Sequence, residues 1–494
     1  MTATGLPDSL YTAEQVRALD RIAIESRGIS GLTLMRRAAE ACVDTLIERW
    51  GEAKTVNVYC GSGNNAGDGY IVAGLLAEKK LDTKAIVVGD VNKLSEDATA
   101  AYDFCKASAA KIVSVSEVEE IGDGIDVIVD ALLGTGAEGE VRSSYRQVIE
   151  SINASDTPVL AVDIPAGLSA DTGGVLGIAI RADVTVTFIA LKQGLFTLDG
   201  PDHVGDLEFS SLGVPEDIYS EVESNCDRLG FGNLIKKFGR RRRNSHKNDF
   251  GHVLVAGGDV GMGGAVAMAA EAALRAGAGL VSVATHPEHT ALVMSRRSEL
   301  MVYGVRNEGE LDSLLEKATV LVLGPGLGKS DWSDLVFEKV ISSDLPSVVD
   351  ADGLNHLAEK SIGKGNWILT PHPGEAKRLL KGKTPDDRFA IVRSIQRQYG
   401  GVVVLKGVGS LLQSESRTSL CPYGNPGMST AGMGDVLSGV IGGLLAQGCN
   451  PSFAAQLGVV VHALAADQNV ETSGIRGLIA TDLLPGIRRL LNDS

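Results

Sequence analysis

The sequence predicts an α/β protein built from two three-layer αβα domains. At 494 residues the chain is too long for one ordinary hydrophobic core. Short apolar stretches typical of buried strands alternate with helical patterns, which predicts largely parallel sheets with helices on both faces. We expect one domain at residues 1–225 and the other at 226–494, because an acidic stretch at 216–223 gives way to a basic one at 236–243.

Charge argues against general nucleic-acid binding. The 62 acidic residues outnumber the 46 basic ones and give a net charge of −16, which would repel a phosphate backbone. The arginine run 240–243 is therefore interpreted as a solvated linker or an interface patch rather than a nuclear-localisation signal. Any phosphate site must be local.

Cysteine usage and hydropathy indicate a cytoplasmic protein. The six cysteines are scattered without close pairs, so neither a zinc site nor a disulfide framework is expected. The N-terminus lacks the basic flank and apolar core of a secretory signal. No uninterrupted apolar run is long enough for a membrane helix, since even the alanine-rich stretch 265–285 contains Glu271 and Arg275. We expect no membrane partner.

The N-terminal half begins with two helical patterns between residues 12 and 50. A strand at 55–60, a glycine-rich loop at 61–69 and a helix at 71–79 follow. Further strands are expected at 83–88, 111–115, 125–130, 158–163 and 184–189. Asp130 and Asp163 each end a strand, and the carboxyl ends of parallel strands form the ligand crevice. These acids are expected to meet the glycine loop, although each could instead cap a following helix.

The glycine loop only partly fits a dinucleotide fingerprint. Gly61-x-Gly63-x-x-Ala66 has the required spacing after a strand. The companion acid should end the second strand, but the nearest fit, Asp90, comes late. Polar side chains also fill the loop, which suggests that it binds more of a ligand than its phosphate groups.

The C-terminal half is organised around the stretch 425–435. Strands are expected at 251–256, 280–285, 320–323, 347–350, 367–370 and 402–406, with helices at 264–276 and 453–470. Gly432 and Gly434 precede an apolar helical run, so their backbone N–H groups would form an anion site at a helix N-terminus. Asp435 falls in the first turn, where it could be merely structural. Beside a phosphate site, however, a carboxylate is better explained as a base that takes a proton from an attacking hydroxyl.

The motif Gly432-x-Gly434-Asp435 resembles that of ribokinase-like enzymes. Segments 245–251, 323–328, 370–375 and 405–407 extend the similarity to the NAD(P)H-hydrate dehydratases over about residues 230 to 490. The resemblance implies contacts to the hydrated coenzyme from Ala265, Gly326, His372 and Asp435. It implies contacts to the nucleotide from Lys406, Gly407, Val408, Gly409, Ser410 and Gly434.

Several of these assignments have simpler alternatives. Lys406 could be a surface lysine at a turn, and His372 could be a core or capping histidine. Glu375 could bind magnesium, either directly or through water. The fusion of two domains in one chain resembles the prokaryotic type, which implies ADP with magnesium as the phosphoryl donor.

The N-terminal half resembles the NAD(P)H-hydrate epimerases. Segments 63–69, 130–136 and 162–168, with Thr187-Phe188 and Lys192, carry the similarity. The resemblance implies that the hydrated nucleotide is contacted by the following residues: Asn64, Asn65, Ala66, Gly67, Asp68, Gly134, Thr135, Gly136, Ala137, Glu138, Gly139, Glu140 and Asp163.

A potassium site is also implied by this resemblance, formed by Asn65 and Asp130. Ala166 stands where the family often has a serine, so only its backbone oxygen could serve as a ligand. Asp163 is our preferred acid/base for epimerisation, with Lys192 as the second candidate.

These features predict a bifunctional repair enzyme. The first half would interconvert the R and S hydrates of NADH and NADPH, known as NADHX and NADPHX, and the second would dehydrate the S form with ADP. One rival is a small-molecule kinase of the ribokinase or hydroxyethylthiazole type, which would release a stable phosphorylated product. Another is a non-catalytic, nucleotide-binding N-terminal half. A homo-oligomer is expected.

Overall fold

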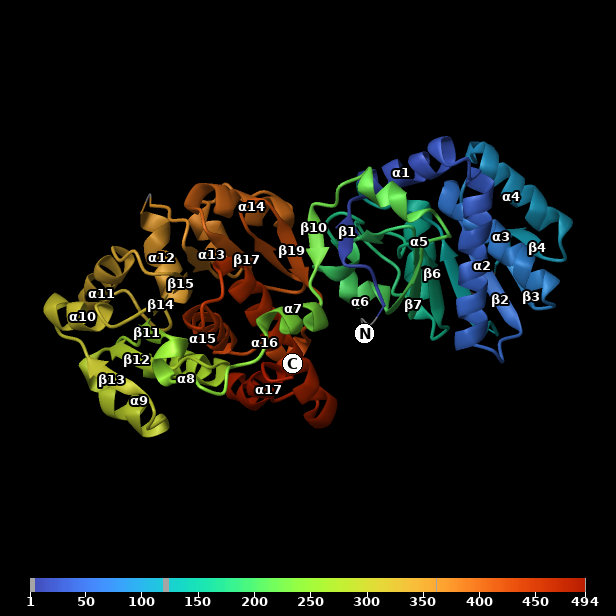
Figure 1. The fold of residues 1–494 in the computed structure, drawn as a ribbon. Helices are drawn as coiled ribbons and strands as arrows, with labels where there is room; N and C mark the ends of the chain where they lie inside the picture. Colours follow the sequence, from blue (N-terminus) through green and yellow to red (C-terminus); the bar gives the residue numbers. More distant parts are fainter. Residues whose placement is uncertain (1–4, 119–123, 361, 494) are drawn as a thin grey trace. The chain divides into compact units, whose positions relative to one another are not determined.

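The computed structural model describes residues 5–118, 124–360 and 362–493. The chain forms two compact units, one ending at Cys226 and the other beginning at Asp227. Figure 1 shows that each unit is a sheet with helices on both faces, so the predicted α/β class is confirmed. Among the described residues, no helix combines the length and apolar character needed to cross a bilayer.

The N-terminal unit contains a seven-stranded parallel sheet in the order β4-β3-β2-β5-β6-β7-β9. Its strands are β2 (Thr55–Cys60), β3 (Asp82–Val87), β4 (Lys111–Ser114), β5 (Val127–Ala131), β6 (Val159–Val162), β7 (Val184–Phe188) and β9 (Asp206–Ser210). The chain builds outward from β2 to β4 and then returns to the other side of β2 with β5. The β2/β5 junction is thus a topological switch point, where α/β sheets bind ligands.

Alternating side chains of this sheet form two cores. Val58 points into the core under α2 (Gly31–Arg49), α3 (Asn64–Glu78) and α4 (Glu96–Ala107). Its neighbour Tyr59 points into the core under α5 (Ser143–Ala154). This alternation is what a parallel sheet covered on both faces requires.

The C-terminal unit has seven parallel strands in the order β13-β12-β11-β14-β15-β16-β17, followed by antiparallel β18 and β19. They are β11 (His252–Ala256), β12 (Leu280–Thr285), β13 (Met301–Gly304), β14 (Val320–Leu323), β15 (Ser347–Val349), β16 (Trp367–Leu369), β17 (Val402–Leu405), β18 (Ser410–Gln413) and β19 (Thr418–Cys421). The switch point here lies between β11 and β14.

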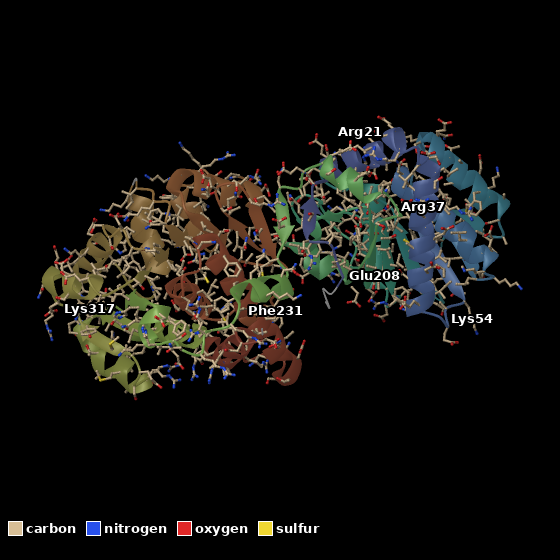
Figure 2. The ribbon with its side chains drawn as sticks, viewed as in Figure 1. Arg21, Arg37, Lys54, Glu208, Phe231 and Lys317 are labelled. Atoms are coloured by element: carbon tan, nitrogen blue, oxygen red, sulfur yellow. The ribbon has the colours of Figure 1, made fainter. Side chains whose placement is uncertain are left out.

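Helices cover both faces of this second sheet. A large apolar core joins one face to α8 (Gly263–Ala276), α15 (Met433–Ala446), α16 (Pro451–Ser473) and α17 (Leu483–Leu490). The helices α11 (Asp331–Ile341), α12 (Ala351–Glu359), α13 (Pro373–Leu379) and α14 (Arg388–Tyr399) complete the unit. Charged side chains such as Lys54 of the N-terminal unit and Lys317 of the C-terminal unit point outward (Figure 2).

Candidate active sites

The N-terminus of α15 is built for close approach of an anion. Gly432 caps the helix with a φ of 89°, a left-handed conformation that favours glycine. A Cβ at Gly434 would lie 3.1 Å from the Lys406 ammonium nitrogen, so the missing side chain leaves the backbone beside that charge. The first N–H groups of a helix have no partner within it. The predicted anion site therefore has the expected local geometry.

Asp435 lies in the first turn of α15, as the sequence predicted. Burial, with a further contribution from Asp350, raises the pKa of Asp435 to about 7. Lys406 opposes this shift but does not cancel it. A carboxyl group that titrates near neutral pH is suited to accept a proton during a reaction and to release it afterwards.

Lys406 is held in a buried ionic network rather than at a surface turn. Its Nζ donates to Oδ1 of Asp350 at 2.7 Å and lies 3.9 Å from Glu375 Oε2. Burial lowers the pKa of Lys406, but Asp350 and Glu375 outweigh burial and raise it overall. The ammonium therefore stays charged beside the anion site.

Asp350 and Ser438 belong to this network although the sequence reasoning did not single them out. Burial would raise the pKa of Asp350, but Lys406 and the hydroxyl of Ser438, which donates at 2.6 Å, hold it below its usual value. Asp350 follows directly after β15. The strand-end rule that selected Asp130 and Asp163 would have found it.

His372 caps helix α13 and faces the same network. Its Nδ1 accepts from the backbone N–H of Gly374 at 2.9 Å, and the backbone N–H of His372 donates to Glu375 Oε2 at 2.8 Å. Burial, with Lys406 and Arg378, lowers the pKa of His372, so the ring is neutral at pH 7. Burial raises the pKa of Glu375 to about 7. His372 is thus a capping residue, as one of the two alternatives predicted. Its ring also lies close enough to Lys406 for that charge to lower its pKa, so the same side chain could contact a substrate bound there.

The remaining predicted dehydratase residues lie at the start of α8, in the loop after β14 and in the segment that leads from β17 into β18. A Cβ at Gly326, whose φ is 59°, would approach the Ala265 methyl carbon to 3.1 Å, so these two positions are neighbours. The loop at 407–409 is tied down by Arg388, which donates to the carbonyls of Lys406 at 3.4 Å and of Val408. Val408 itself is 56% exposed. Nothing in the local sequence marked Arg388 as a support for this loop.

A cavity of about 490 Å³ lies at the β2/β5 switch point of the N-terminal unit. Its lining includes these predicted residues: Asn64, Asn65, Asp68, Gly134, Thr135, Gly136, Ala137, Asp163 and Lys192. Ala66 and Gly67 are buried in α3 and do not line the cavity, and a Cβ at Gly67 would lie 2.5 Å from the sulfur of Met35. Glu138, Gly139 and Glu140 do not line the cavity, and Glu140 pairs with Arg146 at 3.0 Å.

Asp163 and Lys192 form the charged centre of this cavity. The buried Lys192 Nζ donates to Oδ1 of Asp163, to Thr187 Oγ1 at 3.0 Å and to the Phe188 carbonyl at 3.0 Å. Asp163 has a φ of 68°, a left-handed conformation that is uncommon outside glycine. Such a backbone persists where the surrounding contacts enforce it, and it aims the carboxylate at Lys192.

Three further carboxylates line the same cavity: Asp20, Asp68 and Asp97. Burial raises the pKa of Asp20, from α1 (Ala13–Arg21), to about 6. Burial and the charges of Asp163 and Asp20 raise the pKa of Asp68 well above its usual range. Asp20 was not predicted, because it lies within an ordinary amphipathic helix where a polar residue carries no signal of function.

The proposed potassium ligands Asp130 and Ala166 are in direct contact. Oδ2 of Asp130 accepts the Ala166 N–H at 2.8 Å, and Oδ1 accepts that of Leu132 at 3.1 Å. Burial raises the pKa of Asp130 to about 7 despite these bonds. The buried Asn65 side-chain nitrogen has no hydrogen-bond partner among the described residues. The Asp130 carboxylate offers oxygen atoms of the kind that a monovalent cation binds. The unpartnered Asn65 atom is an N–H donor and gives a cation no support, and the Ala166 carbonyl already accepts the Ile180 N–H at 2.9 Å.

The folds and the two sites define the class of this protein. It is an α/β protein with two separate clusters of buried charged side chains, one in each unit, each at the carboxyl ends of parallel strands and each with a carboxyl group whose pKa burial raises to about 6 (Asp20) or about 7 (Asp435).

Comparisons with known proteins identify the family. Residues 253–489 match the NAD(P)H-hydrate dehydratase family, and residues 31–194 match the family described as YjeF-related protein N-terminus. The chain is 48% identical to the bifunctional NAD(P)H-hydrate repair enzyme Nnr of Coxiella burnetii, over 98% of this chain and 99% of that protein. It is 40% identical to the enzyme of the same name from Escherichia coli, over 99% and 95% of the two chains.

A solved structure covers the C-terminal half. The ADP/ATP-dependent NAD(P)H-hydrate dehydratase of Bacillus subtilis, co-crystallized with ATP/Mg2+, is 25% identical, with a TM-score of 0.47, over 53% of this chain and 96% of that one.

The chain belongs to the family of bifunctional NAD(P)H-hydrate repair enzymes. The predicted combination of an NAD(P)H-hydrate epimerase and an NAD(P)H-hydrate dehydratase is confirmed, and the rival kinase interpretation is not favoured.

Proposed function

We propose that the C-terminal site dehydrates the S hydrate of NADH or NADPH by transient phosphorylation from ADP. Asp435 takes the proton from the ring hydroxyl, whose oxygen attacks the terminal phosphorus of ADP and releases AMP. The ring-nitrogen electrons then expel phosphate, the C–O bond breaks, and loss of a ring proton restores the dihydronicotinamide. Hydroxide alone is a poor leaving group, so the phosphoryl transfer supplies the driving force.

The observation that carries this proposal is the placement of Asp435. The carboxyl group lies in the first turn of α15, beside the Lys406 ammonium, and its pKa is raised to about 7 by burial and Asp350. The backbone N–H groups at Gly432 to Gly434 would donate to the transferred phosphoryl group. Loss of one such donor typically costs about 3–4 kcal/mol of transition-state stabilisation.

We propose Asp163 as the acid/base of epimerisation, with Lys192 as its partner. Inverting a carbon that bears both a hydroxyl and the ring nitrogen requires reversible bond cleavage or proton transfer. The Asp163–Lys192 pair can exchange a proton with that hydroxyl, and Asp20 and Asp68 line the same cavity. In this proposal Asn64, Asn65, Asp68 and the 134–137 segment hold the nucleotide.

Two metal ions are proposed on the chemistry of the residues present. Magnesium would neutralise the phosphates of ADP, and Glu375 would hold it through water, since this ion keeps most of its hydration shell. Asp130, Asn65 and the Ala166 carbonyl would hold potassium near the epimerase cavity. We further propose a cytoplasmic homo-oligomer without nucleic-acid or membrane partners, in line with six free cysteines, five of them buried.

The decisive experiment gives the purified protein racemic NADH hydrate with ADP or ATP and follows the absorbance of restored NADH. Recovery of both epimers supports two activities, and recovery of half supports the dehydratase alone. Accumulation of a stable phosphorylated hydrate would favour a kinase. No recovery with either nucleotide would refute the proposal.

A further inference from the structure

One cavity of the C-terminal unit is lined by arginines and is separate from the dehydratase site. It has a volume of about 1080 Å³. It lies among the chain after α7 (Phe231–Phe238), the ends of α8 and α15, the chain after α9 (Thr290–Arg296), and α17. We call it the arginine pocket after these residues: Arg240, Arg241, Arg275, Arg297, Arg488 and Arg489.

Positive charge in this pocket is not balanced by its acids. Only two carboxylates line it, Glu271 and Glu299. The buried Glu271 is already engaged by Arg297 and by Arg275 at 3.8 Å. Glu299 forms no ion pair in the described part of the chain. A concentration of cations in a protein with a net charge of −16 is a local feature that favours an anionic ligand.

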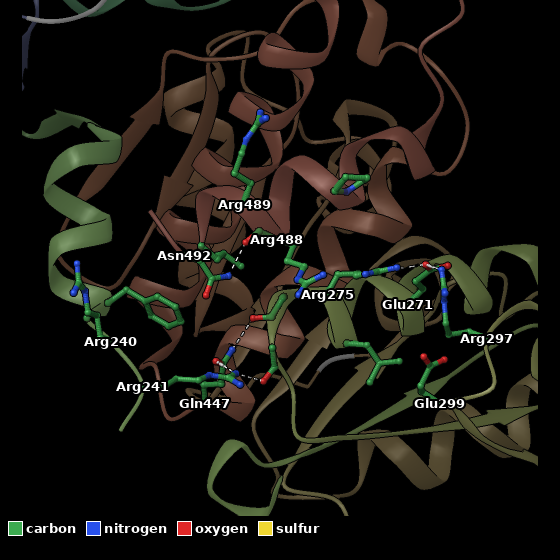
Figure 3. Close-up of a pocket in the computed structure, with 17 residues that line it drawn as sticks. Arg240, Arg241, Glu271, Arg275, Arg297, Glu299, Gln447, Arg488, Arg489 and Asn492 are labelled. Atoms are coloured by element: carbon green, nitrogen blue, oxygen red, sulfur yellow. Dashed lines mark hydrogen bonds and ion pairs between the residues drawn. The ribbon is translucent and has the colours of Figure 1, made fainter. Parts of the chain in front are cut away.

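Several of the arginines are engaged by other residues of the protein, whereas Arg488 is available to a ligand. Arg241 donates to Gln447 Oε1 at 2.5 Å and stacks 3.7 Å above the Phe250 ring, and burial lowers its pKa. The Arg488 guanidinium is exposed and makes no hydrogen bond or ion pair with the described residues. Figure 3 shows Arg488 between the Arg241–Gln447 pair and the Glu271–Arg297 pair in that view.

The size and charge of the pocket indicate the class of ligand. A guanidinium presents paired N–H donors that match the oxygens of a phosphate, and arginines on separate elements can reach more than one such group. The volume is at the upper end of small-molecule sites. We propose that the arginine pocket binds a small molecule of nucleotide size with two or more phosphate groups.

The pocket lies at the opposite end of two helices from the dehydratase site. Helix α8 carries Ala265 at its start and Ala276 at its end, and α15 carries Asp435 at its start and leads into Gln447. Helices of this length span about 20 Å. The proposed ligand would therefore be distinct from the ADP of the reaction.

Calorimetric titration of the full-length protein with inorganic tripolyphosphate tests this proposal. Arg488→Glu should weaken binding to the pocket by about tenfold or more, because it reverses a charge facing the anion. The control Arg397→Glu changes the same charge on the exposed side of α14 and should leave binding unchanged. Equal binding by natural protein and Arg488→Glu, or equal weakening in both variants, would overturn the proposal.

A second variant should act in the opposite direction. Glu299→Gln removes the unpaired carboxylate of the pocket and should tighten tripolyphosphate binding. Retained dehydration of NADH hydrate by each variant shows that it is folded. If Arg488→Glu instead changes only the oligomeric state by light scattering, without affecting tripolyphosphate binding, the pocket is an interface between copies and the proposal is wrong.

Discussion

Two carboxylates of the dehydratase site differ in protonation because their surroundings differ. Asp350 accepts from Lys406 and Ser438 and remains ionised. Asp435 is buried beside the negative charge of Asp350, so the pKa of Asp435 rises to about 7. Pairs of acids whose pKa values are separated in this way are typical of acid–base sites.

Asp435→Asn should therefore abolish ADP-dependent dehydration while leaving epimerisation intact. The amide cannot accept the hydroxyl proton, and loss of a general base typically costs about 10²–10⁴ in rate. The measurement is kcat for NADH recovery from S hydrate. Asp331→Asn is the matched control, because Asp331 also lies in the first turn of a helix but is exposed. A rate near that of the natural protein in Asp435→Asn would remove Asp435 from the mechanism.

The pH profile of dehydration should report the same group. The base must be deprotonated, and the pKa of Asp435 is raised to about 7, so kcat/KM should increase through neutral pH and level off above it. Well below that pKa the rate should fall about tenfold per pH unit. Asp352 raises the pKa of Asp435, so Asp352→Asn should move the acid limb to lower pH. An acid limb that stays in place in that variant would contradict the assignment.

At the scale of elements, helices α8 and α15 pack closely against each other, because glycines of α15 face the backbone of α8. A Cβ at Gly439 would lie 2.0 Å from the Ala269 carbonyl oxygen, and one at Gly443 would lie 2.6 Å from that of Ala273. The close approach fixes the start of α15, with Asp435, relative to the start of α8, with Ala265. The geometry of the proposed dehydratase site thus depends on glycines that do not belong to it.

Gly439→Ala should separate the two helices. The added methyl group collides with backbone, so we expect the free energy of unfolding of the C-terminal unit to fall by about 1–3 kcal/mol. Dehydration should fall with it and epimerisation should not. Denaturant unfolding and the two activities measure this. In the control Gly309→Ala, on exposed α10 (Glu308–Leu315), stability should be unchanged or slightly higher, since only the Asn307 side chain is near.

The local sequence pattern predicted where helices and strands lie better than it predicted which of their side chains are in contact. The helical run after Gly434 placed Asp435 correctly in a first turn, because capping and apolar periodicity are local properties. The sequence did not connect Asp350 with Lys406 and Ser438, which are 56 and 88 residues from Asp350 along the chain. The sequence did not predict Asp20 as a site residue for the same reason, because residues far from it along the chain form the rest of its cavity.

At the scale of the whole molecule, the chain joins two units that each contain a complete core and a site of their own. Each site lies at the carboxyl ends of the parallel strands of its own sheet. The two chemical steps should therefore be separable by mutation.

Asp163→Asn should show this separation with racemic NADH hydrate and ADP. Asparagine tolerates the left-handed backbone of Asp163 better than alanine, so folding is preserved while the acid/base group is lost. Within the time that the natural protein needs for full recovery, the variant should restore only the S half. Absorbance of NADH measures the recovered fraction, and the exposed-site control Asp82→Asn should give full recovery. Full recovery in Asp163→Asn would assign epimerisation to another group.

The N-terminal switch point also has a practical consequence. All the residues proposed for epimerisation follow the carboxyl ends of strands or lie on α1 and α3, so the turn that precedes β2 is not needed for the chemistry. Gly51 and Glu52 are exposed in that turn. A short flexible peptide inserted between them should be accommodated with epimerisation at its natural rate, which gives an attachment point for a fluorophore or an affinity handle.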